Sequence, residues 1–402
     1  MIIQFSVCNY KLFREKATLS MVASDFKDHC FLSENVFVPK GEKSPLVRSA
    51  VVYGANASGK SKLLEALVFM RQYAISSSKD GQKGDRIAVE PFRLGDQQEG
   101  FSEFEVLFVK NGIRYRYGFE VSSTKVNAEW LYIRSKSREM EIFYREGEHI
   151  STHARRFTKG NVVVKEGLLR DNALLLSVAA QFNDAVCREV LDWFQQIEII
   201  RDVRSRQFRQ NAIDKIKTNA GKSDFLHFLR KADMGISDMF VVPLEEGKHA
   251  RESAEVMTVR KIYTEQGEEK KAAFSLNKDE SEGTKKYFYL LGPVVDALNK
   301  GAVLLVDELD AKLHPHLVTM VVNLFHDKES NPNNAQLIFN THSTHILHKG
   351  LFRPDQVWFT EKNHRGEARL YSLAEFKLTQ VNDYADRYLQ GKFGAIPCLT
   401  DL

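Results

Sequence analysis

Apolar and polar positions change their spacing several times along the chain. Loose alternation at 2–7 and a β-branched run at 48–53 predict two strands. The second run ends at a glycine-rich stretch, after which apolar residues recur at helical spacing over 63–74. This order predicts a strand, a tight loop and a helix.

The following segments alternate as β-strands do. Residues 102–110, 113–121 and 128–134 each carry the two-residue period, and Asn111-Gly112 is typical of a hairpin turn. We therefore predict an antiparallel meander in this part of the chain.

Helical spacing dominates the middle of the chain. Apolar residues recur at this spacing over 168–200, and a further short helix is predicted at 223–231. Strand patterns at 260–265 and 272–276 then precede a helical segment at 284–298.

Two buried strands are predicted at 302–309 and 336–343, with an amphipathic helix at 315–326 between them. Because strands that alternate with helices build parallel sheets, this end of the chain predicts an α/β fold.

Composition excludes several classes of protein. The 402 residues are 43% hydrophobic and 27% charged, which is typical of a globular chain of two or three structural units. A net charge of +4 demands neither a nucleic-acid nor a membrane partner. No apolar run approaches the roughly 20 residues that cross a bilayer. Four scattered cysteines and no leader pattern favour a cytoplasmic protein.

Residues 54–61 read GANASGKS, which matches the phosphate-binding pattern G-x-x-x-x-G-K-[ST] between a predicted strand and helix. Glycines let backbone N–H groups turn toward a phosphate. Lys60 supplies a positive charge for the β- and γ-phosphates, and the Ser61 hydroxyl is a ligand for Mg²⁺. The sequence therefore predicts a nucleotide site.

Polar residues that follow the two buried strands extend this site. Asp307 is placed to hold Mg²⁺, and Glu308 to orient or deprotonate the attacking water. His342, directly after the next strand, is expected at the γ-phosphate. A Ser-x-Gly turn at 281–283 starts a helix and is a second anion-binding device. Since one chain needs one phosphate loop, this turn suggests a site completed by another copy.

Together these motifs resemble ABC-type ATPase heads of the SMC/RecF/OLD-like branch. The segments that carry the resemblance are GANASGKS, the opening FSVCNYKLFREKATLSM, ESEGTKK, DELDAKLHP and NTHS. The QVWFTEKN and YLQGKFGAIP segments are similar to a stand-alone bacterial group associated with anti-phage systems, both abortive-infection and restriction-linked.

The resemblance implies a role for each matching residue in a head-to-tail dimer that buries ATP and Mg²⁺ between two heads. Glu308 is the implied catalytic base, with His342 and Lys60 at the phosphates, and Ser61 and Asp307 hold the metal. The nucleotide contacts are Gly54, Asn56, Ser58, Gly59, Lys60, Ser61 and Lys62, with Ser281 and Gly283 capping the partner's ATP and Asp310 communicating across the dimer.

The sequence also departs from the family pattern. The signature motif reads SEGT, so Glu282 brings a negative charge near phosphate and predicts slow or partner-dependent hydrolysis. Gln97 and Gln98 are weak candidates for the glutamine that follows the first helix in such heads. Unlike SMC proteins, the stretch between Lys60 and Ser281 has no long heptad run.

The implied fold is an ABC-ATPase head with a parallel P-loop core, an antiparallel β subdomain and an inserted, mainly helical lid without a long coiled coil. We expect one part of the head at 1–150, a helical basic insert at 151–255 and the rest of the head at 256–402.

Basic residues cluster in the predicted insert at 154–170 and at 201–217. The second cluster includes Arg201, Arg204, Arg206 and Arg209. A solvated helix face, a nucleic-acid contact and a protein interface all remain open for these clusters. Histidines at 342, 345 and 348 wind around a helix, which disfavours a metal site.

Our leading hypothesis is an Mg²⁺-dependent ATPase that works as a homodimer or higher oligomer and regulates a separate effector, a nuclease or toxin, in anti-phage defence. One alternative is a RecF- or SMC-like DNA-binding ATPase in repair or maintenance. Another is an OLD-like nuclease-associated enzyme, although the roughly 60 residues after the Thr-His pair are too few for a fused nuclease domain.

Overall fold

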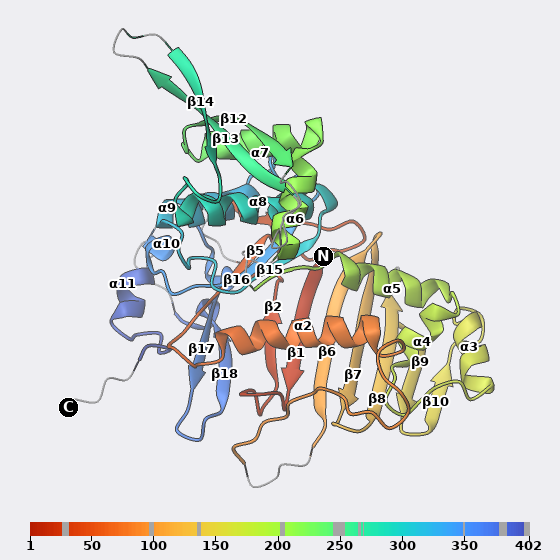
Figure 1. The fold of residues 1–402 in the computed structure, drawn as a ribbon. Helices are drawn as coiled ribbons and strands as arrows, with labels where there is room; N and C mark the ends of the chain where they lie inside the picture. Colours follow the sequence, from red (N-terminus) through yellow and green to blue (C-terminus); the bar gives the residue numbers. More distant parts are fainter. Residues whose placement is uncertain are drawn as a thin grey trace.

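The computed structural model describes residues 1–25, 32–95, 100–134, 138–201, 206–243, 254–263, 267, 269–348, 350–377 and 384–397. Figure 1 shows a broad body built around two sheets, from which a small third sheet projects.

A six-stranded sheet forms the centre of the molecule and draws its strands from distant parts of the sequence. Its order is β11 (Glu198–Ile200), β15 (Val303–Val306), β16 (Gln336–Asn340), β5 (Ser49–Tyr53), β17 (Val357–Lys362) and β18 (Ala368–Ser372). The first five strands are parallel and β18 is antiparallel. Residues of β5, β15 and β16 are buried throughout, as strands covered on both faces must be.

One face of this core sheet is covered by helices from the carboxyl-terminal part of the chain. The helices are α8 (Glu282–Lys300), α9 (Pro315–His326), α10 (His345–His348) and α11 (Tyr384–Leu389). Their buried side chains, such as Tyr287 and Val318, share one apolar cluster with Leu304 and Leu337 of the sheet. The predicted helices at 284–298 and 315–326 are confirmed.

A second apolar cluster joins the core sheet to a seven-stranded antiparallel sheet. Its order is β10 (His149–Thr152), β9 (Met140–Glu146), β8 (Val126–Arg134), β7 (Ile113–Val121), β6 (Ser102–Lys110), β1 (Ile2–Cys8) and β2 (Ala17–Ser20). Helix α2 (Lys60–Ser76) lies across this sheet (Figure 1) and buries Leu63 and Leu67 against both layers. Asn111 and Gly112 both have positive φ, as the predicted hairpin turn requires.

Three helices cover the far end of the antiparallel sheet: α3 (Thr158–Lys165), α4 (Leu175–Gln181) and α5 (Ala185–Gln196). Helical spacing predicted one helical stretch to residue 200, but its last three residues form β11. The β-branched residues Ile199 and Ile200 favour a strand, and β11 pairs in parallel with β15. Arg201, which follows β11 directly, therefore lies at the edge of the core sheet.

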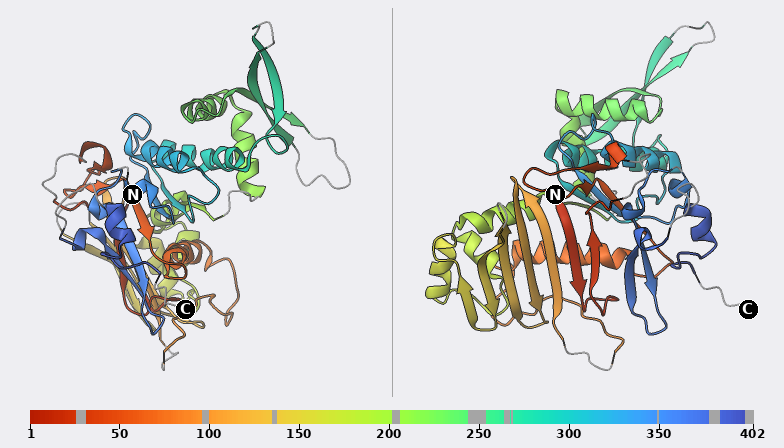
Figure 2. Two further views of the ribbon diagram at one scale, coloured as in Figure 1. Left: turned by 90° about the vertical axis from the view of Figure 1, so that its left-hand side faces the viewer. Right: turned by 180° about the vertical axis from the view of Figure 1, so that it is seen from behind.

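An arm made of α6 (Arg206–Ile216), α7 (Asn219–Lys231), β12 (Ile236–Pro243), β13 (Ala254–Tyr263) and β14 (Glu269–Ser275) rises above α8. Figure 2 shows the β12–β13–β14 sheet standing away from the body in both views. The longest helix within the described ranges is α8 with 19 residues, which is too short for an SMC-type arm.

The remaining elements are short: α1 (Leu32–Asn35), β3 (Val36–Phe37), β4 (Leu46–Val47), η2 (Pro354–Gln356) and η3 (Leu373–Glu375). Among the helices in the described part of the chain, none combines the length and apolarity that a membrane span needs.

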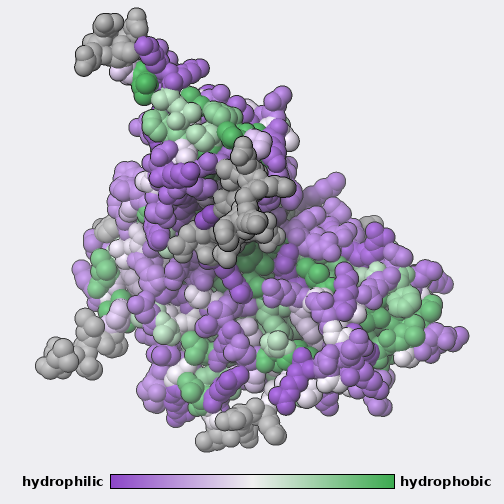
Figure 3. Space-filling view, viewed as in Figure 1, coloured by the Kyte–Doolittle hydropathy of each residue, from purple (hydrophilic) through white to green (hydrophobic). Residues whose placement is uncertain are grey.

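Large apolar side chains reach the surface in two main places. One group lies on the arm and includes Phe240 and Tyr263, and the other surrounds α3 and α4 and includes Val162 and Phe182. In Figure 3 green patches lie over both regions, within an otherwise largely polar face.

Candidate functional site

The phosphate-loop motif lies where its pattern predicted, between β5 and α2. Gly54 and Gly59 have φ of 154° and 118°, and Ala57 between them also has a positive φ of 58°. Helix α2 starts without a side-chain cap, so its first backbone N–H groups are left for another acceptor. A loop of this shape at a 17-residue helix is a ready-made anion site.

Strand β17 contacts this loop through Thr360. A Cβ on Gly54 would lie 2.4 Å from the carbonyl oxygen of Thr360 and 2.5 Å from the Ser58 hydroxyl, so only glycine fits. Buried Ser58 also shares a 2.7 Å hydrogen bond with the Thr360 hydroxyl. Thr360 was not predicted from the sequence, because its role depends on β17 lying beside β5.

Lys60 is only 5% exposed, and its ammonium group is held inside the loop. The Nζ atom donates to the carbonyl oxygens of Gly54 at 2.8 Å and Ala55 at 3.0 Å. Burial lowers the pKa of Lys60, while the nearby carboxylates of Glu308, Asp310 and Asp307 raise it. The loop thus holds a partly desolvated cation beside three acids, which is suited to a polyanionic ligand.

The predicted metal ligands meet at the mouth of the loop. The Ser61 hydroxyl donates to Asp307 Oδ1 over 2.8 Å, and the Asn340 amide donates to the same oxygen over 2.5 Å. Mg²⁺ prefers hard oxygen donors of this kind, and it usually keeps water molecules as its other ligands. The residues therefore fit the predicted magnesium site.

Asn340 is a site residue that the sequence analysis missed. Its side chain is fully buried and bridges two acids: Nδ2 donates to Asp307, and Oδ1 accepts the backbone N–H of Glu308 at 2.6 Å. The signal in the sequence is a polar residue at the end of the apolar run QLIFN. Asn340 can be assigned to the site only when β16 is known to lie between β15 and β5.

Two further predicted residues, Asp310 and His342, are joined to each other. Asp310 Oδ2 accepts the backbone N–H of His342 at 3.2 Å. Asp310 Oδ1 is buried without a hydrogen-bond partner among the described residues. Burial raises the pKa of Tyr53 well above its usual value, and the nearby Asp310 raises it further. The Tyr53 hydroxyl in turn donates to the carbonyl oxygen of Ser343 at 3.0 Å.

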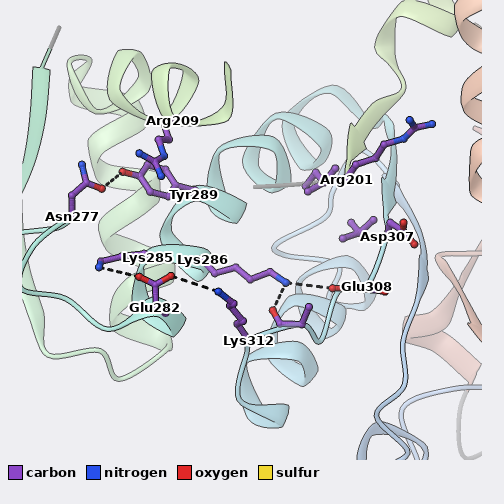
Figure 4. A pocket seen from close by; sticks show the side chains of 13 residues that line it. Arg201, Arg209, Asn277, Glu282, Lys285, Lys286, Tyr289, Asp307, Glu308 and Lys312 are labelled. Carbon is purple, nitrogen blue, oxygen red and sulfur yellow. Dashed lines mark hydrogen bonds and ion pairs between the residues drawn. The ribbon is translucent and has the colours of Figure 1, made fainter. Parts of the chain in front are cut away.

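The signature turn starts α8 on the far side of a cavity of about 520 Å³ from Asp307, a predicted metal ligand. Ser281 caps the helix by accepting the N–H of Thr284 at 3.1 Å. In Figure 4, Glu282, Lys285 and Lys312 lie at one end of this cavity, and Asp307 and Glu308 lie at the other. Glu282 pairs with Lys285 at 3.1 Å and with Lys312 at 4.0 Å, which offsets its negative charge.

The structure places the remaining predicted residues as follows. Asn56 is exposed on the loop. Lys62 donates to Glu65, one turn further along α2, at 2.9 Å. Gly283 packs near the Lys312 carbonyl, where an added Cβ would lie 3.5 Å away. Gln97 and Gln98 lie outside the described residues.

Of the four arginines of the predicted basic patch, Arg201 and Arg209 both line the cavity beside the metal ligands. Arg201 follows β11 directly, and the guanidinium of Arg209 lies over the Tyr289 ring at 5.6 Å. Arg206 begins α6, and Arg204 lies outside the described residues. The structure thus brings two of these positive charges to the same cavity as Asp307 and Glu308.

A phosphate loop, paired metal ligands and an acid after the neighbouring strand, all on a parallel core sheet, define a P-loop nucleotide-binding domain. Residues 49–348, which are 300 of the 402 residues, match the family described as "AAA domain, putative AbiEii toxin, Type IV TA system". The chain belongs to this family, and the match supports the expected ABC-type ATPase.

No curated protein matches the chain. Among solved structures, cbiO1 from Clostridium perfringens, part of the ABC transporter complex cbiONQ, aligns at 12% sequence identity. The alignment covers 97% of this chain and 92% of that chain, with a TM-score of 0.31.

Proposed function

We propose that this protein binds ATP with Mg²⁺ and hydrolyses the bond between the β- and γ-phosphates. The observation that carries the proposal is the set of contacts around Asp307, whose Oδ1 atom accepts from both Ser61 and Asn340 while Glu308 follows it directly. Bound Mg²⁺ would neutralise charge on the phosphates, with Ser61 and Asp307 as its protein ligands.

The chain's own residues supply the remaining parts of the reaction. Lys60 binds the phosphate oxygens, and the backbone N–H groups at the start of α2 orient them. Glu308 accepts a proton from the attacking water, whose oxygen bonds to the γ-phosphorus as ADP leaves. His342, whose backbone is held by Asp310, lies at the end of the next strand and is the proposed contact of the γ-phosphate.

The active form in this proposal is a homodimer arranged head to tail. Ser281 and Gly283 start α8 across the cavity from Asp307, so the same chain has a phosphate loop and a separate helix start. In the dimer each signature turn caps the ATP on the partner's loop, and Asp310 lies where the two heads meet. Glu282, although paired with lysines, keeps a carboxylate near phosphate and makes hydrolysis slow or partner-dependent.

We further propose that the ATPase regulates a separate effector, a nuclease or toxin, in cytoplasmic anti-phage defence. The family description names a putative toxin of a type IV toxin–antitoxin system, and the resemblance to stand-alone anti-phage ATPases points the same way. Exposed apolar groups on the arm and around α3 are of the kind that binds partner proteins.

A second candidate function is nucleic-acid binding, as in RecF- or SMC-like proteins. The observation that favours it is a hollow on α7 lined by Lys222, His227, Arg230 and Lys231. Such a basic surface would contact a phosphate backbone, and binding would weaken steeply with salt. A stable complex with a protein partner that does not respond to salt in this way favours the effector instead.

Mixing two inactive variants tests the proposed ATPase dimer. Lys60→Met removes the phosphate contact and Ser281→Arg blocks the signature turn, so each variant alone is expected to release no phosphate. A mixture is expected to regain measurable turnover, up to about a quarter of the parental value, because half of the dimers are mixed and each has one intact site of two.

The matched control is Lys125→Met, which changes an exposed lysine in a turn and is expected to keep parental turnover. Phosphate release would be measured with Mg²⁺ and with the metal chelated. Parental turnover in Lys60→Met would contradict the site, and inactive mixtures would contradict the head-to-tail arrangement.

A further inference from the structure

Lys286 joins the start of the signature helix to the loop that carries Glu308. It lies five residues after Ser281 on α8, and its ammonium group reaches across to three backbone carbonyl oxygens. The Nζ atom donates to Glu308 at 3.3 Å, to Leu309 at 3.5 Å and, most closely, to Ala311. Figure 4 shows this side chain spanning the cavity between α8 and the loop.

The loop needs this support because its backbone is unusual. Glu308 has a φ of 51°, in the left-handed region that residues other than glycine rarely adopt. Its N–H group is held by the Asn340 side chain, and its carbonyl oxygen accepts both the Ala311 N–H at 3.1 Å and the Lys286 ammonium. The contacts from Asn340 and Lys286 therefore reach the peptide units on both sides of the Glu308 Cα, which orients its side chain.

The two contacts come from different parts of the fold. Asn340 ends β16 in the core sheet, whereas Lys286 belongs to α8, whose start is the proposed contact with the partner's ATP. A second contact also joins the start of α8 to this region. Glu282 of the signature turn pairs with Lys312, which lies just beyond the loop. A shift of the α8 start is therefore transmitted to the carbonyls around Glu308.

We propose that Lys286 is a positioning residue that couples the two ATP sites of the dimer. When the α8 start of one protomer caps the partner's ATP, Lys286 sets the backbone of Glu308 in that protomer's own site. Each site then turns over fastest when the other site is also filled. This inference rests on the proposed ATPase dimer but concerns contacts within a single chain.

The test compares Lys286→Met, Lys286→Arg and the control Lys300→Met. Lys300 ends the same helix and pairs at 3.4 Å with Glu198, so its loss removes a lysine contact far from the loop. Lys286→Met is expected to bind ATP with a Kd within about twofold of the parent. Its kcat is expected to fall about 10- to 100-fold, since a misplacement near 1 Å costs this much.

Cooperativity distinguishes coupling from a merely structural role. The parent is expected to show a Hill coefficient above 1 for ATP, and Lys286→Met a value of 1. Lys286→Arg keeps donors for the carbonyls and is expected to retain both the rate and the cooperativity to within a few-fold, while Lys300→Met behaves as the parent. Parental kcat and cooperativity in Lys286→Met would overturn the proposal.

Amide hydrogen exchange of the segment 307–312 supplies a readout that does not require turnover. In the parent, a non-hydrolysable ATP analogue with Mg²⁺ is expected to slow exchange in this segment. In Lys286→Met the analogue still binds, but the exchange is expected to stay fast. If the analogue slows amide exchange equally in both proteins, the proposed coupling is wrong, whether or not the parent hydrolyses ATP. If the parent shows no Glu308-dependent hydrolysis, the proposed function is wrong, and the exchange result still decides the coupling.

Discussion

Replacing Asn340 by leucine, which has a similar volume, removes two hydrogen bonds from the centre of the site. Asp307 Oδ1 loses the amide donor at 2.5 Å, and the Glu308 N–H loses its acceptor at 2.6 Å. Because Asn340 is fully buried, no water replaces the lost amide at its own position. Both the proposed metal ligand and the proposed catalytic base are then less firmly held.

The size of the effect follows from the two bonds. A hydrogen bond to a carboxylate contributes about 1.5–3 kcal/mol and one between neutral groups about 1 kcal/mol, so Asn340→Leu is expected to cost about 3 kcal/mol of folding free energy. Turnover is expected to fall about 10- to 100-fold, because Glu308 is no longer fixed in its left-handed conformation. More Mg²⁺ is expected to be needed for half-maximal rate.

The assay measures phosphate release against Mg²⁺ concentration, together with urea unfolding. Asn331→Leu is the matched control, since Asn331 is equally buried and bonds to Phe325 and Ala335 away from the site. The control is expected to lose similar stability but to keep the parental rate and Mg²⁺ dependence. If both variants slow turnover equally, or if Asn340→Leu keeps the parental rate, the reasoning about Asn340 is wrong.

Two further predictions concern the loop and a buried acid. Gly54→Ala places a methyl group 2.4 Å from the Thr360 carbonyl oxygen. The variant is expected to lose about 1–3 kcal/mol of stability, measured by thermal melting, and to bind ATP more weakly, measured by equilibrium binding. An unchanged melting temperature and an unchanged Kd would contradict the close fit. Burial raises the pKa of Glu129 from 4.5 to about 7, although it accepts the N–H groups of Leu175 and Leu176. The folded state therefore keeps a proton that the unfolded chain releases, so stability falls as pH rises from about 4.5 to about 7, by about 3 kcal/mol. Urea unfolding of Glu129→Gln is expected to lack this loss, and a slope against pH equal to the parental one would refute the assignment.

Sequence patterns predicted those parts of the fold whose signals are local. The phosphate loop, the acid pair after β15 and the hairpin at Asn111 each depend on neighbouring residues, and the structure places all three as expected. Helical period failed at 198–200, where β-branched residues form the edge strand β11. Whether such a short segment forms a strand depends on the sheet with which it pairs.

The supporting residues of the site could not be predicted in the same way. Asn340, Thr360 and Lys286 act on residues 20 or more positions away in sequence, and their roles depend on strand order and on the position of α8. The sequence also did not show that two members of the basic cluster, Arg201 and Arg209, line the cavity beside Asp307.

The central claim is that Glu308 is the base of an ATP site closed by a second copy of the chain. The most direct measurement is the molecular mass, by light scattering, of Glu308→Gln with Mg²⁺ and ATP. We predict that this variant binds ATP, releases phosphate far more slowly than the parent and accumulates as a stable dimer. A variant that remains monomeric with ATP and hydrolyses it at the parental rate would contradict both the role of Glu308 and the dimeric site.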